Sequence, residues 1–493
     1  MLQATWLDRA VGFLSPQRAL RRQRARVAMG VIARHYEASA TSRRTQGWYR
    51  TATDANSAIG PSLAKLRDAA RDLVRNNPYA ESALTTIADQ AVSWGLVPAE
   101  GARLDAWTRW STTTDCDADG RHDLAGLQKL VMRTTVEAGE VLVRRRMRRL
   151  EDGFALPLQI QILEPDHLDA TKDAPSLTGG GCIVQGVEFD VLGRRVAYHL
   201  YRTHPGAAVS LTGSTFGGSV RVPASEIRHV FKSSRPGQVR GPSWFAPVLL
   251  RFKDFDEMED ATLMTQKIAA LLSVITTDTN GDSPGLGTVD DTTTPGIDSL
   301  EPGMILNLQP GRDVHVVSPP STSNYDAYAK TQLRAIATGL GVSYEDLTGD
   351  YGELSFSAAR MSRLRHLAHI EDWRWRILVP QFLNPVWAWA MEASEMMGLP
   401  TVAATEWTAP PLPMIEPDKE GLAIMRNIRT GITTWSEEIR ARGYNRDQFL
   451  AELQADFEEM DRRGLTLDCD PRKLTQAGQF QSAGATTAPG VPA

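Results

Sequence analysis

The 493-residue sequence is poor in cysteine, and the three cysteines that it has are scattered. Cys116, Cys182 and Cys469 form no CxxC pair and no spacing typical of a metal site, and their number is odd. This usage indicates a reducing, cytosolic compartment rather than a disulfide framework. No run of 18 apolar residues exists either, so we expect no helix that spans a membrane.

Motifs of enzyme chemistry are also absent. The sequence contains no GxxxxGK(S/T) phosphate-binding loop, no GxSxG and no HExxH. Gly285 and Gly287 lack the third glycine of a dinucleotide fingerprint, which favours a flexible turn. The formal net charge of -5 does not favour tight binding of a polyanion through bulk charge. We therefore predict a protein that is not an enzyme and that uses no cofactor and no metal.

The composition that remains is typical of a large globular protein. Hydrophobic residues make up 42% and charged residues 23% of the chain. The length predicts roughly three domains. Blocks with a helical period alternate with blocks that have a strand period, which predicts an α+β fold.

Periodicity and its breakers predict the order of the elements. Predicted helices cover 62–75, 79–93, 105–114, 123–137, 242–276, 324–340 and, with kinks at Pro380 and Pro385, 356–398. Predicted strands cover 141–149, 156–162, 184–189, 195–201, 220–222, 227–231, 304–308 and 314–317. We expect a loop at 341–355, a proline-rich linker at 409–417 and three short helices within 418–463.

The densest basic run comprises Arg144, Arg145, Arg146, Arg148 and Arg149. Alternation along a strand places them on both faces, so no single surface carries all five. Such a run can contact nucleic acid or an acidic neighbour. Salt bridges, or a solvated hairpin tip, are the interpretation that we favour.

The predicted helix at 242–276 has an acidic polar side that comprises Asp254, Asp256, Glu257, Glu259 and Asp260. A solvated surface is the simplest explanation of this face. If several copies of the chain surround a hole, however, the same carboxylates would line it and repel phosphates. DNA could then slide through the hole without sticking to its wall.

The most site-like cluster comprises His366, His369, Glu371 and Asp372. On a helix His366, His369 and Asp372 share a face, and two histidines with one carboxylate can bind a metal ion. Five arginines surround the cluster: Arg360, Arg363, Arg365, Arg374 and Arg376. We therefore favour a solvated face of an arginine-rich helix over a metal site.

Seven segments, in a shared order, resemble the portal proteins of the lambda type. They are RDLVRNNPYAESAL (71–84), EAGEVLVR (137–144), LEPDHLD (163–169), GVEFDVLGRRVAYHLYRTHPG (186–206), IRHVFKSSRPGQVRGPSWFAPVL (227–249), LRAIATGLGVSYEDLTGDYGELSFSAAR (333–360) and EPDKEGLAIMRNIRTGITTWSEEIRARGYN (416–445). Each segment is a weak pattern alone. Their common order, from about residue 60 to about residue 460, makes the resemblance specific.

The resemblance implies a portal-protein fold, mainly helical with β-rich wing and clip segments, that forms a ring of twelve subunits at one capsid vertex. Such rings pass double-stranded DNA inward during packaging and outward during ejection. A separate terminase motor hydrolyses ATP, which agrees with the missing phosphate-binding loop. The implied partners are the terminase large subunit, a head-completion or adaptor protein, and the major capsid and scaffold proteins. The implied location is the virion, at the portal vertex, after assembly in the host cytoplasm.

Composition and the lack of periodicity predict an N-terminal arm (1–60), which matches no part of the portal plan, and a disordered tail (464–493). Between them the portal plan implies a wing (61–242), stem helix (243–276), clip (277–323), second stem helix (324–341), tunnel loop (342–356), long wing helix (357–408) and crown (409–463). The implied clip faces the terminase and later the head-completion proteins. The tunnel-loop candidates are Tyr344, Glu345, Asp346, Asp350, Tyr351 and Glu353. This loop has no lysine or arginine, so a basic grip on DNA is not expected there.

Two alternatives have different consequences. A metal-dependent nucleic-acid enzyme would use His366, His369 and either Glu371 or Asp372. A monomeric adaptor would bind protein partners only and would form no ring.

Overall fold

The computed structural model of the chain describes residues 52–98, 104–178, 180–208, 217–270, 274–278, 312–316, 325–352, 355–403, 405–410, 416–442 and 446–465. Helices and antiparallel strands alternate along these residues, which confirms the predicted α+β class. The chain divides into Met1–Asp54 and Ala55–Ala493, and the elements that follow all belong to the second unit.

The first group of elements is helical. It comprises α3 (Ala55–Ile59), α4 (Leu63–Asn76), α5 (Pro78–Val92), α6 (Asp105–Ser111) and α7 (Leu124–Ala138). Asn77 separates α4 from α5, because its Oδ1 accepts hydrogen bonds from the backbone N–H groups of Tyr79 (3.0 Å) and Ala80 (3.1 Å). Pro78 fits the first turn, where no partner for its missing N–H is needed. The predicted break before Pro78 is therefore confirmed.

Two antiparallel sheets follow. The first has the order β3-β2-β8, with β2 (Glu140–Met147) between β3 (Leu158–Leu163) and β8 (Ile227–Phe231). The second has the order β4 (Cys182–Val184), β5 (Val187–Phe189), β6 (Arg195–Leu200) and β7 (Val220–Pro223). Five of the six strands predicted between 141 and 231 are present, although β2 ends before Arg148. The single strand predicted at 184–189 was wrong, because a turn at Gln185 and Gly186, both with positive φ, divides it into the antiparallel strands β4 and β5.

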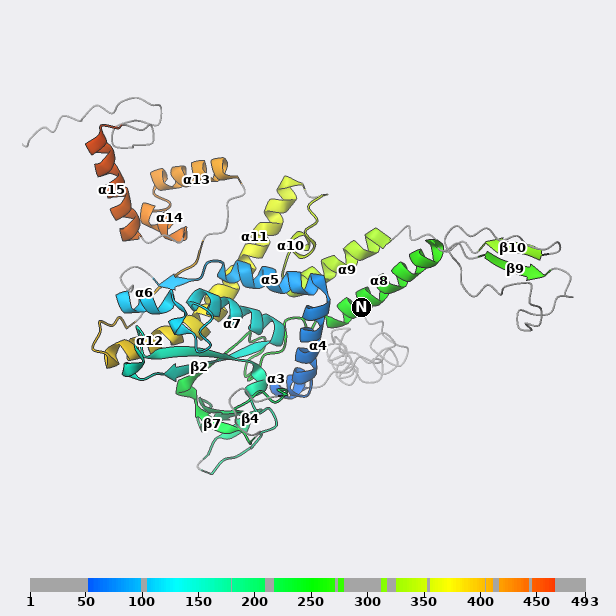
Figure 1. Cartoon of the computed structure of the whole chain (residues 1–493), viewed down its shortest axis with the longest axis horizontal. Coiled ribbons are helices and arrows are strands. Elements are labelled where there is room, and N and C mark those ends of the chain that lie inside the picture. The colour runs from blue at the N-terminus through cyan, green and yellow to red at the C-terminus, as the bar shows by residue number, and fades with distance from the viewer. Residues whose placement is uncertain are drawn as a thin grey trace, which may run out of the picture. The chain divides into compact units, whose positions relative to one another are not determined.

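The helices α8 (Leu249–Ala270) and α9 (Tyr325–Leu340) lie side by side in opposite directions (Figure 1). Arg251 donates a hydrogen bond to Gln332 Oε1 (3.1 Å), and the Tyr325 hydroxyl donates to Glu259 Oε1 (3.0 Å). The bounds of α9 confirm the predicted helix at 324–340.

The prediction of one helix from 242 to 276 was wrong at both ends. Residues 244–248 form turns, and Ser243 Oγ accepts a hydrogen bond from the Phe245 N–H (3.2 Å) before α8 begins. At the other end β9 (Val274–Asp278) pairs with β10 (Arg312–Val316). Four consecutive β-branched residues in β9 favour a strand over a helix. β10 overlaps the predicted strand at 314–317, whereas the one at 304–308 lies outside the described residues.

The predicted loop at 341–355 was wrong in part, because it contains the short helix α10 (Tyr344–Thr348). Ser343 Oγ accepts a hydrogen bond from the Asp346 N–H (2.9 Å), which caps the first turn. Gly349 ends the helix with a φ of 71°, a conformation that favours glycine. Five residues are too few for a helical period to be recognised, so only the two caps could have indicated it.

The predicted helix at 356–398 is present in three consecutive parts. They are α11 (Phe356–Trp373), the π-helix η9 (Arg374–Leu383) and α12 (Asn384–Met396). Pro380 lies within η9 and has no N–H to donate, so a regular α-helical pattern cannot pass through it unchanged. Pro385 lies in the first turn of α12, where proline is tolerated.

The last described elements are α13 (Pro417–Thr430), α14 (Trp435–Ala441) and α15 (Arg446–Arg463), which confirm the three predicted short helices. Among the described residues no helix has both the length and the apolarity that a membrane crossing requires.

A cluster of buried tryptophans joins the helical and strand parts of the core. The ring centroid of Trp107 in α6 is 4.7 Å from that of Trp387 in α12 and 6.3 Å from that of Trp407 in β11 (Trp407–Thr408). Trp110 Nε1 donates a hydrogen bond to the backbone oxygen of Leu158 in β3 (2.6 Å). Each aromatic contact of this kind adds about 0.5–1.5 kcal/mol beyond area burial. The cluster thereby holds α12 against the first sheet.

Candidate functional site

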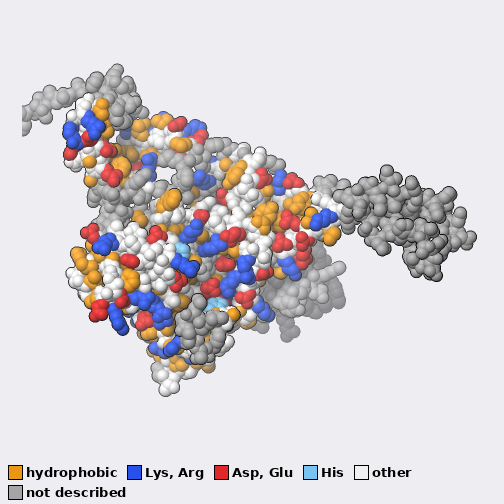
Figure 2. Space-filling model, in the orientation of Figure 1, with side chains coloured by type: hydrophobic (Ala, Val, Ile, Leu, Met, Phe, Trp, Pro, Cys, Tyr) orange, Lys and Arg blue, Asp and Glu red, His pale blue; other side chains and the backbone are white. Residues whose placement is uncertain are grey.

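The acidic side chains of α8 divide between two sides of the helix. Asp254, Glu257 and Asp260 recur every three residues and are exposed, and we call them the acidic stripe. Phe252 and Phe255 are buried and anchor α8 to the core. Figure 2 shows acidic side chains gathered over the first half of α8. The stripe is therefore a solvent-facing surface of negative charge.

Asp256 and Glu259 lie on the packed side of α8, so the prediction of one acidic face with all five carboxylates was wrong. Asp256 accepts a hydrogen bond from Asn77 Nδ2 (2.6 Å), and Glu259 accepts one from the Tyr325 hydroxyl (3.0 Å). Burial raises the pKa of Asp256, although the Asn77 hydrogen bond opposes this shift. The 3.6-residue period of the helix turns these two side chains away from the stripe.

The predicted tunnel-loop residues lie in and after α10. Tyr344, Glu345 and Asp346 form its first turn, Asp350 and Tyr351 follow it, and Glu353 lies outside the described residues. Tyr344 contacts the guanidinium of Arg334 in α9, which is 5.3 Å from the ring centroid. The residues 342–352 carry no cation themselves, but α9 supplies one beside them.

A hollow of about 330 Å³ lies between α9, α10 and α11. Arg334, Arg365 and Glu345 bring charged groups to its lining, together with His366 and His369. Glu345 accepts a hydrogen bond from Ser362 Oγ in α11 (3.5 Å). The hydrogen bond ties α10 to α11 across this hollow.

The favoured interpretation of the histidine cluster as a solvated face was wrong for His366, which is buried. The geometry does not fit the metal alternative either. The Nδ1 atom of His366 is 3.1 Å from the Gly341 carbonyl oxygen, and its Nε2 atom meets Gln90 Oε1. Burial lowers the pKa of His366, which favours the neutral ring. Glu371 instead accepts from Trp375 Nε1, and Asp372 pairs with Arg376 (3.0 Å). A metal needs its ligand atoms to converge, and these side chains do not.

Within the described residues one group, Glu164, Asp166 and His204, has the spacing of metal ligands. The Arg71 guanidinium already occupies this position, with Nη2 at 2.9 Å from Glu164 and 2.7 Å from Asp166. Because a fixed cation balances the carboxylates, the group forms an ion-pair cluster. Its residues do not require a metal.

The basic run lies on β2 and just after it, and four of its arginines bind other side chains of the same chain. Arg144 pairs with Glu226 (3.9 Å) and Arg145 with Glu392 (2.5 Å). Arg146 donates a hydrogen bond to Gln161 (2.8 Å), and Arg148 donates one to Gln159 (2.7 Å). The Arg149 backbone N–H donates to Asp152 (3.0 Å). The salt-bridge interpretation therefore fits Arg144 and Arg145, whereas Arg146 and Arg148 bind neutral glutamines.

Sequence analysis missed a buried charge network around Glu140, the first residue of β2. Glu140 is fully buried, and its carboxylate accepts hydrogen bonds from Arg240 Nη2 (2.5 Å), the Gly241 N–H (2.9 Å) and His229 Nε2 (2.9 Å). Burial alone would raise the pKa of Glu140, but the Arg240 charge and the His229 hydrogen bond hold it below its usual range. Burial lowers the pKa of His229, which favours the neutral ring. Because an ionised carboxylate can only accept, the single ring proton lies on Nε2.

One sequence signal for this network exists in the segment EAGEVLVR, where a carboxylate directly precedes the apolar run from Val141 to Val143. Gly139 precedes it, and a Cβ atom at Gly139 would lie 2.4 Å from the Gly241 carbonyl oxygen. The two glycines thus let the backbones approach closely enough for Glu140 to reach Arg240 and Gly241.

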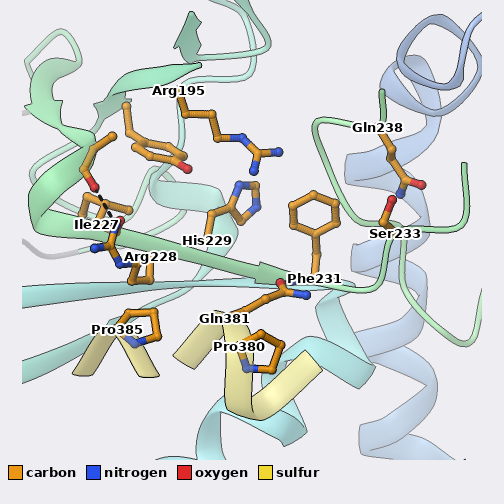
Figure 3. Close-up of a pocket in the computed structure, with 12 residues that line it drawn as sticks. Arg195, Ile227, Arg228, His229, Phe231, Ser233, Gln238, Pro380, Gln381 and Pro385 are labelled. Carbon is orange, nitrogen blue, oxygen red and sulfur yellow. Dashed lines mark hydrogen bonds between the residues drawn. The ribbon is translucent and has the colours of Figure 1, made fainter. Parts of the chain in front are cut away.

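A larger hollow of about 570 Å³ lies between β6, β8 and η9. Arg195, His229 and Phe231 point into the same space, with Gln381 opposite them on η9 (Figure 3). Gln381 Oε1 accepts a hydrogen bond from the Phe231 N–H (3.0 Å), which ties the π-helix to the edge of the first sheet. The lining includes Arg228 as a second arginine and no carboxylate, so the hollow suits an anionic group better than a cationic one.

Comparisons with known proteins agree on one family. A family model described as "Phage portal protein, lambda family" matches residues 41–374. The chain is 26% identical over 473 residues to a "Probable portal protein" of Halomonas phage phiHAP-1, with 88% of each chain covered. It is 21% identical over 482 residues to "Portal protein B" of Escherichia phage lambda, with 86% of this chain and 88% of that protein covered.

A solved structure titled "Neck of native GTA particle computed with C12 symmetry" is also similar. Its TM-score is 0.46 at 15% identity, with 76% of this chain and 93% of that chain covered.

Proposed function

Because the chain belongs to the lambda family of phage portal proteins, we propose that it forms a ring of twelve subunits at one capsid vertex, through which double-stranded DNA is packaged and ejected. The family establishes the coarser statement that the chain is a structural portal component of a phage capsid. A ring of identical subunits is the usual way to build a closed channel.

The acidic stripe is the observation that carries the channel proposal. In a ring whose α8 helices surround the axis, Asp254, Glu257 and Asp260 of every subunit would face the passing duplex. A wall of negative charge in a confined channel repels phosphates, so DNA would pass without being held. The buried Phe252 and Phe255 would keep each helix fixed while it does so.

The other segments of the proposed subunit would have the roles that the portal plan gives them. The wing would occupy 61–242, the clip 277–323, the tunnel loop 342–356 and the crown 409–463. The clip would bind the terminase large subunit and later a head-completion or adaptor protein, and the outer surface of the ring would contact the major capsid and scaffold proteins. Within the clip range the described residues are limited to parts of the β9–β10 pair.

Electron microscopy of the purified protein, with mass measured by light scattering, tests the ring. We expect rings with a central hole and a mass of about twelve times the 54.2 kDa of one chain. Because assembly can need partners, the same measurement is made after co-expression with the scaffold and capsid proteins. A homogeneous monomer under both conditions would overturn the ring and would favour the monomeric adaptor.

A further inference from the structure

The hollow between β6, β8 and η9 contains two arginines without a carboxylate partner. Neither Arg195 nor Arg228 forms an ion pair within the described residues, whereas Arg145 on β2 pairs with Glu392. The Arg195 guanidinium lies 5.4 Å from the centroid of the Phe231 ring, and its side chain points into the hollow (Figure 3). Because no carboxylate lines this space, the two cations leave a positive charge that nothing in the hollow compensates.

A buried nitrogen on the wall of the same hollow also lacks a partner. The His229 side chain is 1% exposed, and its Nδ1 atom has no hydrogen-bond partner within the part of the chain that the structure describes. Its Nε2 atom carries the ring proton, because it donates to the ionised carboxylate of Glu140 (2.9 Å). Nδ1 is therefore a lone-pair acceptor, and a buried acceptor without a donor is unfavourable. A ligand that fills the hollow can satisfy this atom only by donating a hydrogen bond.

The Tyr198 phenol supplies a donor beside His229. The two rings pack edge to face, with their centroids 5.8 Å apart. Among the described residues the Tyr198 hydroxyl has no hydrogen-bond partner, although the side chain is 3% exposed and lines the hollow. Burial raises the pKa of Tyr198, and the charges of Arg195 and Arg228 oppose this shift. The phenol therefore keeps its proton and can donate it to a ligand oxygen.

Together these groups fit an anion that carries a proton of its own. Arginine and phenol groups donate to negatively charged oxygens, whereas the histidine nitrogen needs a donor. Carboxylates, sulfate and the phosphodiesters of DNA have no proton to donate at pH 8. A phosphate monoester has also lost its second proton there, since it does so with a pKa of about 6. Inorganic phosphate differs from all of these, because it keeps a P–OH group at this pH.

We propose that the hollow between β6, β8 and η9 is a binding site for inorganic phosphate. The phosphate oxygens accept hydrogen bonds from Arg195 and Tyr198, and the P–OH group donates one to His229 Nδ1. Arg228 adds positive charge from the lining. The volume of about 570 Å³ holds the ion together with several water molecules. This site is independent of the proposed ring, because all of its groups belong to one chain.

Isothermal titration calorimetry of the full chain at pH 8 and constant ionic strength tests the proposal. Hydrogen phosphate and sulfate carry the same charge at this pH, so the proton is the difference that the comparison isolates. We expect phosphate to bind about tenfold more tightly than sulfate or phosphoserine. Equal affinities for phosphate and sulfate would overturn the proposal and leave a hollow that attracts anions through charge alone. Absence of phosphate binding at millimolar concentrations would overturn it as well.

Three variants locate the bound phosphate. Arg195→Gln should weaken phosphate binding about tenfold, because it removes a charged donor from the hollow. Tyr198→Phe removes a hydroxyl without a partner in the free chain, so it should leave the melting temperature unchanged and weaken binding about threefold. Arg194→Gln is the matched control, since Arg194 is the exposed neighbour that does not line the hollow. Equal losses in Arg194→Gln and Arg195→Gln would overturn the assigned position.

Discussion

Glu140 remains ionised at full burial because three donors surround its carboxylate. Arg67, itself buried, lies a little farther away, with Nη1 at 3.9 Å from Glu140 and Nη2 at 3.2 Å from Asp166. The network therefore connects α4 to β2 and to the segment before α8. Buried charges of this kind stabilise a fold only while they stay paired.

The variant Glu140→Gln should lower the free energy of unfolding by about 3–5 kcal/mol, because it leaves the buried Arg240 charge uncompensated. Urea unfolding at pH 7 measures the change. The matched control is Glu164→Gln, which removes an ion pair with a half-exposed carboxylate and should cost at most about 1 kcal/mol. If both variants lowered the free energy of unfolding equally, burial would not be the reason that Glu140 matters more than Glu164.

At the scale of elements, α10 is held by its ends. Ser343 caps one end, Gly349 closes the other in the left-handed region, and Leu347 is the buried anchor between them. A helix of five residues has few hydrogen bonds of its own, so its stability depends on these caps.

The variant Gly349→Ala should open α10 locally, because alanine is strained at a φ of 71° by about 1 kcal/mol. Hydrogen exchange of residues 344–348 should accelerate by about fivefold while the melting temperature changes little. The control is Gly352→Ala, whose added Cβ would be no closer than 3.4 Å to its neighbours and which has no positive φ. Unchanged exchange in Gly349→Ala would show that the surrounding helices, and not the cap, hold α10.

The acidic stripe belongs to the same scale, since it depends on one face of one helix. The triple variant Asp254→Asn/Glu257→Gln/Asp260→Asn should raise the affinity of rings for linear duplex DNA by about tenfold at low salt, and less at high salt because ions screen exposed charges. Fluorescence anisotropy with a labelled duplex measures this. The control triple, Asp68→Asn/Asp72→Asn/Glu151→Gln, removes the same charge from exposed positions elsewhere. An equal gain in the control would contradict a channel role for the stripe.

At the scale of the whole molecule, buried histidines couple stability to pH. Burial lowers the pKa of His199, His229 and His366. As the pH falls below about 6.5, these histidines become protonated in the unfolded chain but stay neutral in the folded chain. Protonation therefore favours the unfolded chain, and folding becomes less favourable. The stability that the neutral histidines contribute is fully present above that pH and is lost as the pH falls towards their pKa values in the folded state.

We expect the free energy of unfolding of the monomer to fall by about 1–3 kcal/mol between pH 7 and pH 5. Urea titrations at several pH values measure the slope. The variant His366→Gln removes one of the three groups and should make the slope shallower. A flat profile, or a gain in stability on acidification, would contradict the lowered pKa values.

The sequence by itself predicted most helices and strands, because hydrophobic periodicity and its breakers are local properties. Asn77 and Pro78 placed the α4–α5 boundary, and most strands from β2 to β8 followed their alternation, although the turn between β4 and β5 was missed. The ordered segments from RDLVRNNPYAESAL onward indicated the portal family before any fold was known. The errors fell where local signals were short or mixed, as in α10 and β9.

Only the tertiary structure decided which side chains act together. It separated Asp256 and Glu259 from the stripe, because Asn77 and Tyr325 approach α8 from distant parts of the chain. In the folded chain His366 of α11 contacts Gly341 and Gln90. Glu140, His229 and Arg240 form one network. Residues far apart in sequence meet only through packing. A local pattern can therefore specify the helix that carries a charge, but not the partner that the charge will find.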